Sequence, residues 1–248
     1  MRRLLVVLCI LALSRDALGQ AAAQETPQEP ARESSEDIWK KCRGNDPDGR
    51  LTACSILIAR AQDTPAELAS AYYARGSAYR QKSLFALALA DFDAAIKANP
   101  DLTDAYGDRG ITLTILGRYT DAIADFSRVL EIYPNLSYAF YNRGICYELI
   151  GLDDLAIDDI SAAIALEPRG EYRFERRGTI HFRNNRLDEA LADYEQALVI
   201  NPQYPSALYG RGIIRTKKGD LAGGGADIAA ATRYRPSIAA EMERAGVK

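Results

Sequence analysis

The residues that could act as acids, bases, nucleophiles or metal ligands are few in this 248-residue sequence, and they are scattered along it. His181 is the only histidine, and histidine is the residue that general acid–base catalysis uses most often. A zinc site would need more ligands than Cys42 and Cys54, and His181 lies far along the chain from both. We therefore predict no catalytic residue, no cofactor and no metal site, and a protein that is not an enzyme.

Two stretches have the composition of ligand-binding loops but lack the required spacing. GNDPDG suggests a calcium loop, yet its first and twelfth ligand positions would hold Gly44 and Ser55, neither of which supplies a carboxylate. GDLAGGGAD, at 219–227, lacks the Lys-Ser/Thr ending of a phosphate-binding loop. We interpret the first stretch as a polar turn and the second as part of a helix.

The N-terminus has the layout of an export signal. MRRLLVVLCILAL places two arginines before an apolar run, and small residues follow it. The alternative is a membrane anchor, but the run ends at Ser14, short of the roughly 20 residues that a spanning helix needs. We predict a signal peptide at 1–19 with cleavage between 19 and 23, and a disordered leader at 20–35 that is rich in Gln, Glu, Pro and Ala. The mature protein would have no membrane span and would be periplasmic in a Gram-negative bacterium and otherwise secreted.

The charge balance excludes one class of partner. The formal net charge is −3, and no basic stripe is present that could displace counterions from phosphates. We therefore predict no nucleic-acid partner.

The dipeptide Arg-Gly recurs five times at intervals of 34 residues, without an insertion. Glycine inside a helix costs about 1 kcal/mol relative to alanine, so its regular return indicates a repeating unit. Proline recurs with the same period, and within each unit an apolar stripe at helical spacing stops at a turn and then resumes. Each unit is therefore predicted to be a helical hairpin. The units are 69–102, 103–136, 137–170, 171–204 and 205–238.

The repeated positions resemble the tetratricopeptide repeat (TPR). That family has aromatic residues near position 4, Gly at 8, Ala at 20, a large apolar residue at 24 and Pro at 32. This sequence matches with Tyr72, Tyr106, Phe140 and Phe174 at position 4, with Ala88, Ala122, Ala156 and Ala190 at position 20, and with Pro100, Pro134, Pro168, Pro202 and Pro236 at position 32. The resemblance implies an all-α, right-handed solenoid, and the whole chain is similar to exported single-domain TPR proteins of Gram-negative bacteria. It also implies that Gly at position 8 allows close approach to position 20.

An arginine at position 7 and an aspartate at position 23 recur together in every repeat. The arginines are Arg75, Arg109, Arg143, Arg177 and Arg211, and the aspartates are Asp91, Asp125, Asp159, Asp193 and Asp227. We interpret them as a structural ladder of ion pairs, within or between hairpins. The alternative is a track of arginines that binds an anion.

Extending the period in both directions predicts the two ends of the solenoid. Residues 36–68 form a degenerate hairpin in which Cys42 and Cys54 take positions 8 and 20, where the TPR helices come closest, so we predict a disulfide between them. Cys146 is predicted to be free and buried. Residues 239–248 are predicted to form a capping helix and tail.

In TPR proteins the first helices of the hairpins line a concave groove. The corresponding residues here are Tyr73, Ile111, Ile115, Tyr138, Tyr141, Ile145, Leu149, Tyr172 and Tyr209, together with the basic residues Arg176, Arg183 and Lys217. We predict that this groove binds a protein or peptide partner, as an extended segment with apolar anchors and an acidic end or as a helix. The tyrosines could instead pack against neighbouring repeats. The alternative function is an envelope-assembly or enzyme-accessory factor that binds a protein or a cell-wall polymer through its convex face or its ends.

Overall fold

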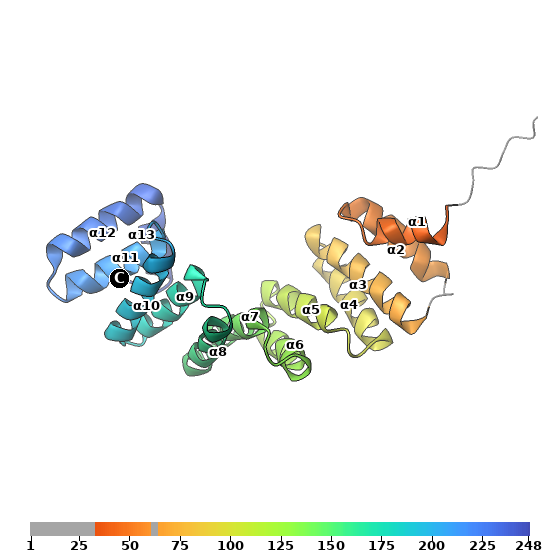
Figure 1. Cartoon of the computed structure of the whole chain (residues 1–248), viewed down its shortest axis with the longest axis horizontal. Helices are drawn as coiled ribbons and strands as arrows, with labels where there is room; N and C mark the ends of the chain where they lie inside the picture. Colours follow the sequence, from red (N-terminus) through yellow and green to blue (C-terminus); the bar gives the residue numbers. More distant parts are fainter. Residues whose placement is uncertain (1–32, 61–63) are drawn as a thin grey trace, which may run out of the picture. The chain divides into compact units, whose positions relative to one another are not determined.

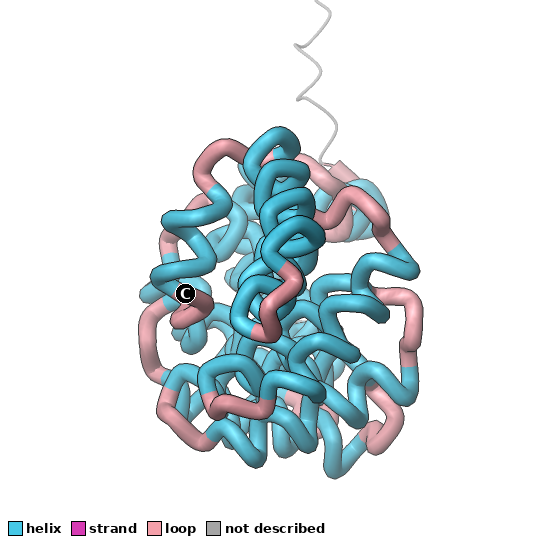
Figure 2. Tube along the Cα trace, turned by 90° about the vertical axis from the view of Figure 1, so that its left-hand side faces the viewer, coloured by secondary structure: helices cyan, strands magenta, loops and turns pink. Residues whose placement is uncertain are grey.

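A computed structural model describes residues 33–60 and 64–248, so the predicted signal peptide and nearly all of the leader lie outside the described part. Within that part the chain forms helices and no strand (Figure 2). The helices belong to one compact unit, Ser35–Lys248, in which helical hairpins follow one another in sequence order (Figure 1). The predicted all-α fold is confirmed.

Six hairpins and a final helix make up this unit. The hairpins are α1 (Ser35–Cys42) with α2 (Pro47–Arg60), α3 (Pro65–Gln81) with α4 (Phe85–Ala98), α5 (Thr103–Ile115) with α6 (Tyr119–Ile132), α7 (Ser137–Leu149) with α8 (Asp153–Leu166), α9 (Glu171–Arg183) with α10 (Leu187–Ile200), and α11 (Pro205–Lys217) with α12 (Leu221–Tyr234). The final helix is α13 (Ile238–Arg244).

The turn inside each of the five repeats depends on one residue with a left-handed backbone. Gly117, Gly151 and Gly219 have φ values of 74°, 79° and 93°, and Ser83 and Asn185 occupy the same position with φ of 58°. Glycine adopts this conformation without a Cβ penalty, and asparagine tolerates it better than most residues. The turn therefore ends the first helix of every repeat at the same register.

The first repeat starts earlier than its predicted boundary at residue 69. Helix α3 begins at Pro65, because Thr64 and Glu67 form a capping box that adds a turn to its N-terminus. Helices α5, α7, α9 and α11 begin at the first residue of their predicted repeats.

The glycines at position 8 allow the two helices of a hairpin to pack closely. A Cβ on Gly144 would lie 3.0 Å from the side chain of Ile160 and 3.2 Å from the carbonyl oxygen of Ala156. The close neighbours are therefore the large residue at position 24 as well as the predicted small residue at position 20. The position-24 side chains Phe92, Phe126, Ile160 and Tyr194 are fully buried.

Both ends of the row of hairpins are closed. At the N-terminal end, Cys42 and Cys54 are joined by a disulfide with a Cα–Cα distance of 4.9 Å, inside a small apolar cluster that includes Ile38 and Leu57. At the C-terminal end, α13 buries Ile238 and Met242 against the core of the last two repeats.

Candidate functional site

The position-7 arginines are held inside the structure by the position-23 aspartates. In the third repeat, Arg143 donates from Nε to Asp159 Oδ2 at 2.7 Å and from Nη2 to Asp159 Oδ1 at 2.9 Å. This hydrogen bonding raises the pKa of the Arg143 guanidinium. The same two-pronged contact joins Arg75 to Asp91, Arg109 to Asp125, Arg177 to Asp193 and Arg211 to Asp227.

Four of these arginines also reach back to the preceding hairpin. Arg143 Nη1 donates to Ser127 Oγ at 3.0 Å, and Arg177 Nη1 donates to Ser161 Oγ at 2.8 Å. Arg75 contacts Ser55 and Arg109 contacts Asp93 in the same way. The arginines thus link helices within and between hairpins. Because these donors are engaged inside the structure, the geometry favours the structural ladder over an anion-binding track.

Two other residues with reactive side chains lie in packing positions. His181 is largely buried, with Nε2 3.9 Å from Asp193 Oδ2, and burial lowers its pKa. Cys146 is a free, fully buried thiol beside the Thr114 hydroxyl, and burial raises its pKa.

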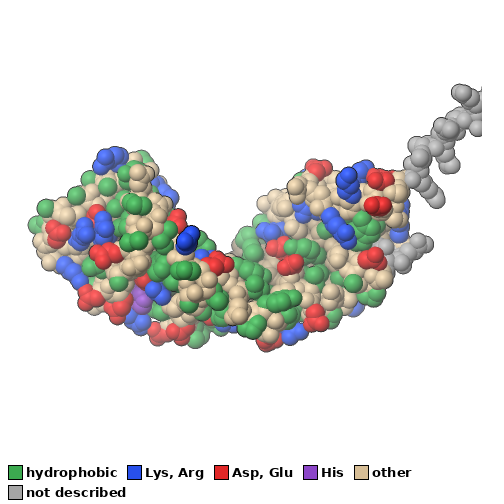
Figure 3. Space-filling model, viewed as in Figure 1, with side chains coloured by type: hydrophobic (Ala, Val, Ile, Leu, Met, Phe, Trp, Pro, Cys, Tyr) green, Lys and Arg blue, Asp and Glu red, His purple; other side chains and the backbone are tan. Residues whose placement is uncertain are grey.

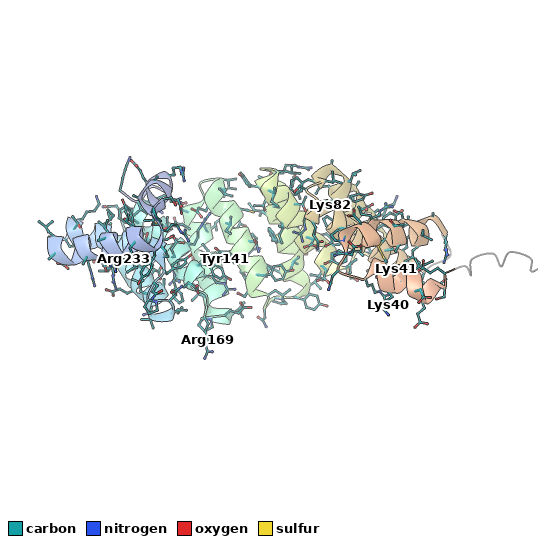
Figure 4. The ribbon with its side chains drawn as sticks, turned by 90° about the horizontal axis from the view of Figure 1, so that it is seen from above. Lys40, Lys41, Lys82, Tyr141, Arg169 and Arg233 are labelled. Carbon is teal, nitrogen blue, oxygen red and sulfur yellow. A yellow bond between two sulfur atoms is a disulfide. The ribbon has the colours of Figure 1, made fainter. Side chains whose placement is uncertain are left out.

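The first helices of the hairpins form one continuous surface, which we call the inner face. Helices α3, α5, α7, α9 and α11 make up this face, and α3–α5, α5–α7 and α9–α11 contact each other directly. The space-filling view shows a hollow on this side of the unit (Figure 3). Seen from above, Tyr141 lies near the middle of the face (Figure 4).

The structure divides the predicted groove residues into two groups. Ile115, Leu149, Tyr172 and Tyr138 are 55%, 46%, 39% and 37% exposed. The others are at least partly packed. Ile111 lies against the core of the second repeat, Tyr141 against that of the third and Tyr209 against that of the last two. The Tyr73 ring lies beside the Phe92 ring at a tilt of 39°, and Ile145 is half-buried. The second group therefore packs as the alternative predicted, and the binding prediction now concerns the four exposed residues.

Large side chains fill the junction between α7 and α9. The rings of Tyr141 and Tyr172 meet edge to face with centroids 5.0 Å apart. Arg173 lies over both rings and donates to the Glu167 carboxylate. Arg173 occupies repeat position 3, which is alanine in the other four repeats. This break in the repeat pattern is the sequence signal that could have singled out Arg173.

The predicted basic residues of the groove are mostly neutralised. Glu148, whose side chain is only 7% exposed, accepts from Arg176 at 2.5 Å and from Arg183 at 2.7 Å. Arg183 also pairs with Asp153. Lys217 lies over the Phe182 ring and has no ion pair within the described residues. We predicted an acidic ligand end from the positive charges of Arg176, Arg183 and Lys217. Because both arginines are paired, only the charge of Lys217 remains unpaired within the described residues.

A largely buried carboxyl group, missed from the sequence, lies behind the tyrosines. Thr179 Oγ1 donates to Glu175 Oε1 at 3.1 Å, and the same hydroxyl lies 3.1 Å from the Tyr194 hydroxyl. Burial raises the pKa of Glu175, and burial together with the nearby Glu175 carboxyl raises the pKa of Tyr204 to about 12. Glu175 replaces the tyrosine or glycine found at position 5 of the other repeats.

Helices α3 and α5 of the inner face carry carboxylates that we did not predict from the sequence. Arg80 pairs with Asp108 at 3.2 Å, and burial together with the charges of Asp108 and Asp104 raises the pKa of Tyr73. Asp104 lies close enough to Asp108 to raise its pKa, although burial is the larger cause. Burial raises the pKa of the Tyr138 hydroxyl, and the charges of Asp104 and Asp108 raise it further.

Comparison with known proteins identifies the family. Two models of the tetratricopeptide repeat match the sequence, one over residues 73–137 and 116–171 and the other over 178–219. These matches together span more than half of the chain. The chain belongs to the TPR family.

Solved TPR structures share the fold. PilF from Pseudomonas aeruginosa superposes with a TM-score of 0.68 at 14% identity, over 86% of this chain and 96% of PilF. YrrB, described as a TPR protein with an unusual peptide-binding site, gives 0.64 at 19% identity over 78% and 99%. MamA from Desulfovibrio magneticus gives 0.59 at 20% identity over 76% and 100%. No curated protein matches the sequence.

The described residues contain no helix long and apolar enough to cross a bilayer. They also contain no group of three or more His, Cys, Asp or Glu side chains arranged to hold a metal ion.

Proposed function

We propose that this TPR protein is a non-enzymatic interaction scaffold whose inner face binds an extended segment or a helix of a partner protein. TPR proteins bind protein or peptide partners and are generally without catalytic activity. The observation that carries the proposal is the row of exposed apolar side chains on consecutive first helices, Ile115, Tyr138, Leu149 and Tyr172. Tyrosines provide rigid, amphipathic contact area, as binding surfaces commonly do.

The second helices supply the surface for the alternative function. Leu87, Leu155, Val199 and Leu221 are exposed on α4, α8, α10 and α12. An envelope-assembly or enzyme-accessory factor that binds a protein or a cell-wall polymer through its convex face would use these side chains.

We also propose that the protein acts outside the cytoplasm. The N-terminal apolar run and the Cys42–Cys54 disulfide both support this location, since disulfides persist in oxidising compartments.

Crosslinking in the native compartment, followed by mass spectrometry, would test the binding mode. We expect one stoichiometric partner, crosslinked mainly to the first helices. Tyr172→Ala and Tyr138→Ala should weaken the recovered complex by at least about tenfold each, as interface tyrosines often do. Tyr234→Ala is the matched control, because Tyr234 is an exposed tyrosine on a second helix.

The outcome separates the two functions. Partner crosslinks confined to second helices, with full affinity in both inner-face variants, would contradict the groove and favour the convex face. Recovery of saccharide-bearing fragments without a protein would favour a polymer ligand.

A further inference from the structure

A surface pocket lined by apolar and acidic residues lies between the starts of α5 and α7. It is lined chiefly by Asp101, Leu102, Asp104, Tyr133, Leu136 and Tyr138. We call it the α5–α7 pocket. Its residues come from two repeats and from the loops that precede their first helices, so it exists only because the two repeats stack.

Negative charge exceeds positive charge around this pocket. Asp104 is exposed and makes no ion pair or side-chain hydrogen bond within the described part of the chain. Asp101 pairs with Arg128 at 3.5 Å, a long contact between two well-exposed groups. Asp108 lies beside Asp104, and its one cationic partner is Arg80. Arg128 also pairs with Glu131 at 3.0 Å, so these two arginines face four carboxylates.

The tyrosines are placed so that their rings remain accessible. Tyr133 is 54% exposed and Tyr138 is 37% exposed. The hydroxyl of Tyr138 rests against α5 at Gly107, where a Cβ would lie 2.8 Å from that oxygen. Glycine at this position thus lets the Tyr138 side chain lie across from α7 to α5, which brings its ring beside Asp104.

Helix capping accounts for only part of this arrangement. Acidic residues near a helix N-terminus interact favourably with the helix dipole, and Asp101 and Asp104 lie at the start of α5. That effect does not require leucines and tyrosines around the carboxylates. An acidic residue at position 2 does not recur, since the other repeats have Ser70, Tyr138, Tyr172 and Ser206 there. Helices α3 and α9 carry their first-turn acidic residues, Glu67 and Glu171, at other positions.

We propose that the α5–α7 pocket receives a lysine or arginine side chain of the partner segment, with its aliphatic stem on Leu102 and Leu136 and its charged head beside Asp104. The complementarity has three parts. Leucines cover methylene groups, a tyrosine face attracts a cation, and an unpaired carboxylate supplies the counter-charge. The proposal rests on the proposed function, because the segment must lie along the inner face. It assigns the partner a basic residue at α5 and α7, whereas the sequence predicted only an acidic end, near the basic residues of α9 and α11.

Selection from a random peptide library on the purified protein would test the pocket. Peptides of about 12 residues, at about 3.3 Å per residue when extended, are long enough to cross several repeats. We expect the enriched peptides to share a lysine or arginine at a fixed distance from apolar residues. Changing that residue to glutamine should weaken binding about tenfold, the combined effect expected of a cation–π contact and an accessible ion pair.

Matched variants assign the effect to the pocket. Asp104→Asn keeps the size of the side chain and should remove most of the preference for the basic residue, and it should reduce the salt dependence of binding. Asp158→Asn is the control, because Asp158 is an exposed carboxylate on the second helix α8 without an ion pair in the described part. It should bind like the wild type. Thermal unfolding of both variants checks that the fold is retained.

The other outcomes would overturn the cation pocket alone, count against both proposals, or assign the pocket to a second copy of the chain. Enriched peptides that lack a basic position but lose affinity with Tyr172→Ala would overturn the cation pocket and keep the groove. An absence of enrichment, or peptides insensitive to both Asp104→Asn and Tyr172→Ala, would overturn the pocket and count against the groove as well. A concentration-dependent dimer in sedimentation that disappears with Asp104→Asn would assign the pocket to a second copy of the chain.

Discussion

At the scale of single residues, the arginine in each Arg-Gly pair is a structural residue. Arg143 is about a fifth exposed, while the Asp159 side chain that it contacts is 9% exposed. The planar guanidinium satisfies both carboxylate oxygens and still has a donor for the preceding hairpin. A leucine at this position, usual in the TPR family, could make none of these contacts.

Arg143→Leu should therefore be strongly destabilising. It leaves the Asp159 carboxylate buried without a counter-charge, and breaking such a pair costs about 3–5 kcal/mol. We expect a loss near the lower end of this range, because Arg143 retains some contact with water. The double variant Arg143→Leu/Asp159→Leu should recover most of the loss. Chemical denaturation of the wild type and both variants measures the free energy of unfolding. An equal loss of stability in the single and the double variant would contradict this expectation.

The Glu175 carboxyl group should make the stability depend on pH. Its pKa in the folded state is raised above 4.5 by burial, so its ionised form destabilises the folded protein at neutral pH. Glu175→Gln removes that ionisation and keeps an acceptor for Thr179. The variant should be at least as stable as the wild type at neutral pH. Its advantage should shrink as the pH falls through the folded-state pKa and vanish near 4.5.

Thermal unfolding of both proteins between about pH 4.5 and 7.5 measures this difference. Comparing the two proteins cancels the pH dependence of every other ionisable group, because they share all of them. A variant that is less stable than the wild type at neutral pH, with a deficit that shrinks on acidification, would show that the pKa of Glu175 is lowered instead.

At the scale of the elements, a hairpin forms because two helices approach closely at one small residue. Gly144→Ala would gain up to about 1 kcal/mol of helix propensity. However, its Cβ would meet the Ile160 side chain and the backbone carbonyl of Ala156 at 3.0–3.2 Å. We expect a net loss of about 1–3 kcal/mol from overpacking. Gly225→Ala is the matched control in α12, because no atom lies within 4 Å of the new Cβ, and it should be neutral or stabilising.

The N-terminal hairpin depends on a covalent link in place of such a contact. The disulfide spans a sequence separation of 12 residues, for which the chain-entropy model gives about 3 kcal/mol. Cys42→Ala/Cys54→Ala should raise hydrogen exchange in α1 and α2 first and leave α5–α12 nearly unchanged. Peptide mapping of the exported protein without reductant should find Cys42 linked to Cys54 and Cys146 free, and an alkylated Cys42 would contradict the prediction.

At the scale of the whole described unit, the row of repeats needs a cover at its C-terminal end. Met242 on α13 is 3% exposed and belongs to the core of the last repeats, whereas its neighbour Glu243 is exposed. Met242→Lys should release α13, cost at least about 2 kcal/mol and promote association through the uncovered apolar surface. Glu243→Lys adds the same side chain one position away and should do neither. Thermal unfolding and sedimentation distinguish the two results.

The local structure of this protein is determined by its sequence. The 34-residue period predicts where the hairpins and their glycines lie, and it places Cys42 and Cys54 where two helices of a hairpin meet. The ladder also follows from the period, because Arg143 and Asp159 are 16 residues apart within one hairpin. Contacts inside a hairpin depend on helix geometry and one turn, and both repeat.

Only the tertiary structure decided which inner-face residues are available to a partner. Glu148 and Arg176 are 28 residues apart and belong to different repeats, so their pairing depends on how α7 packs against α9. The α5–α7 pocket likewise combines Asp104 of one repeat with Tyr138 of the next. These residues break the repeat pattern, so no period predicts their neighbours. Their exposure and their net charge are set by the stacking of non-identical repeats.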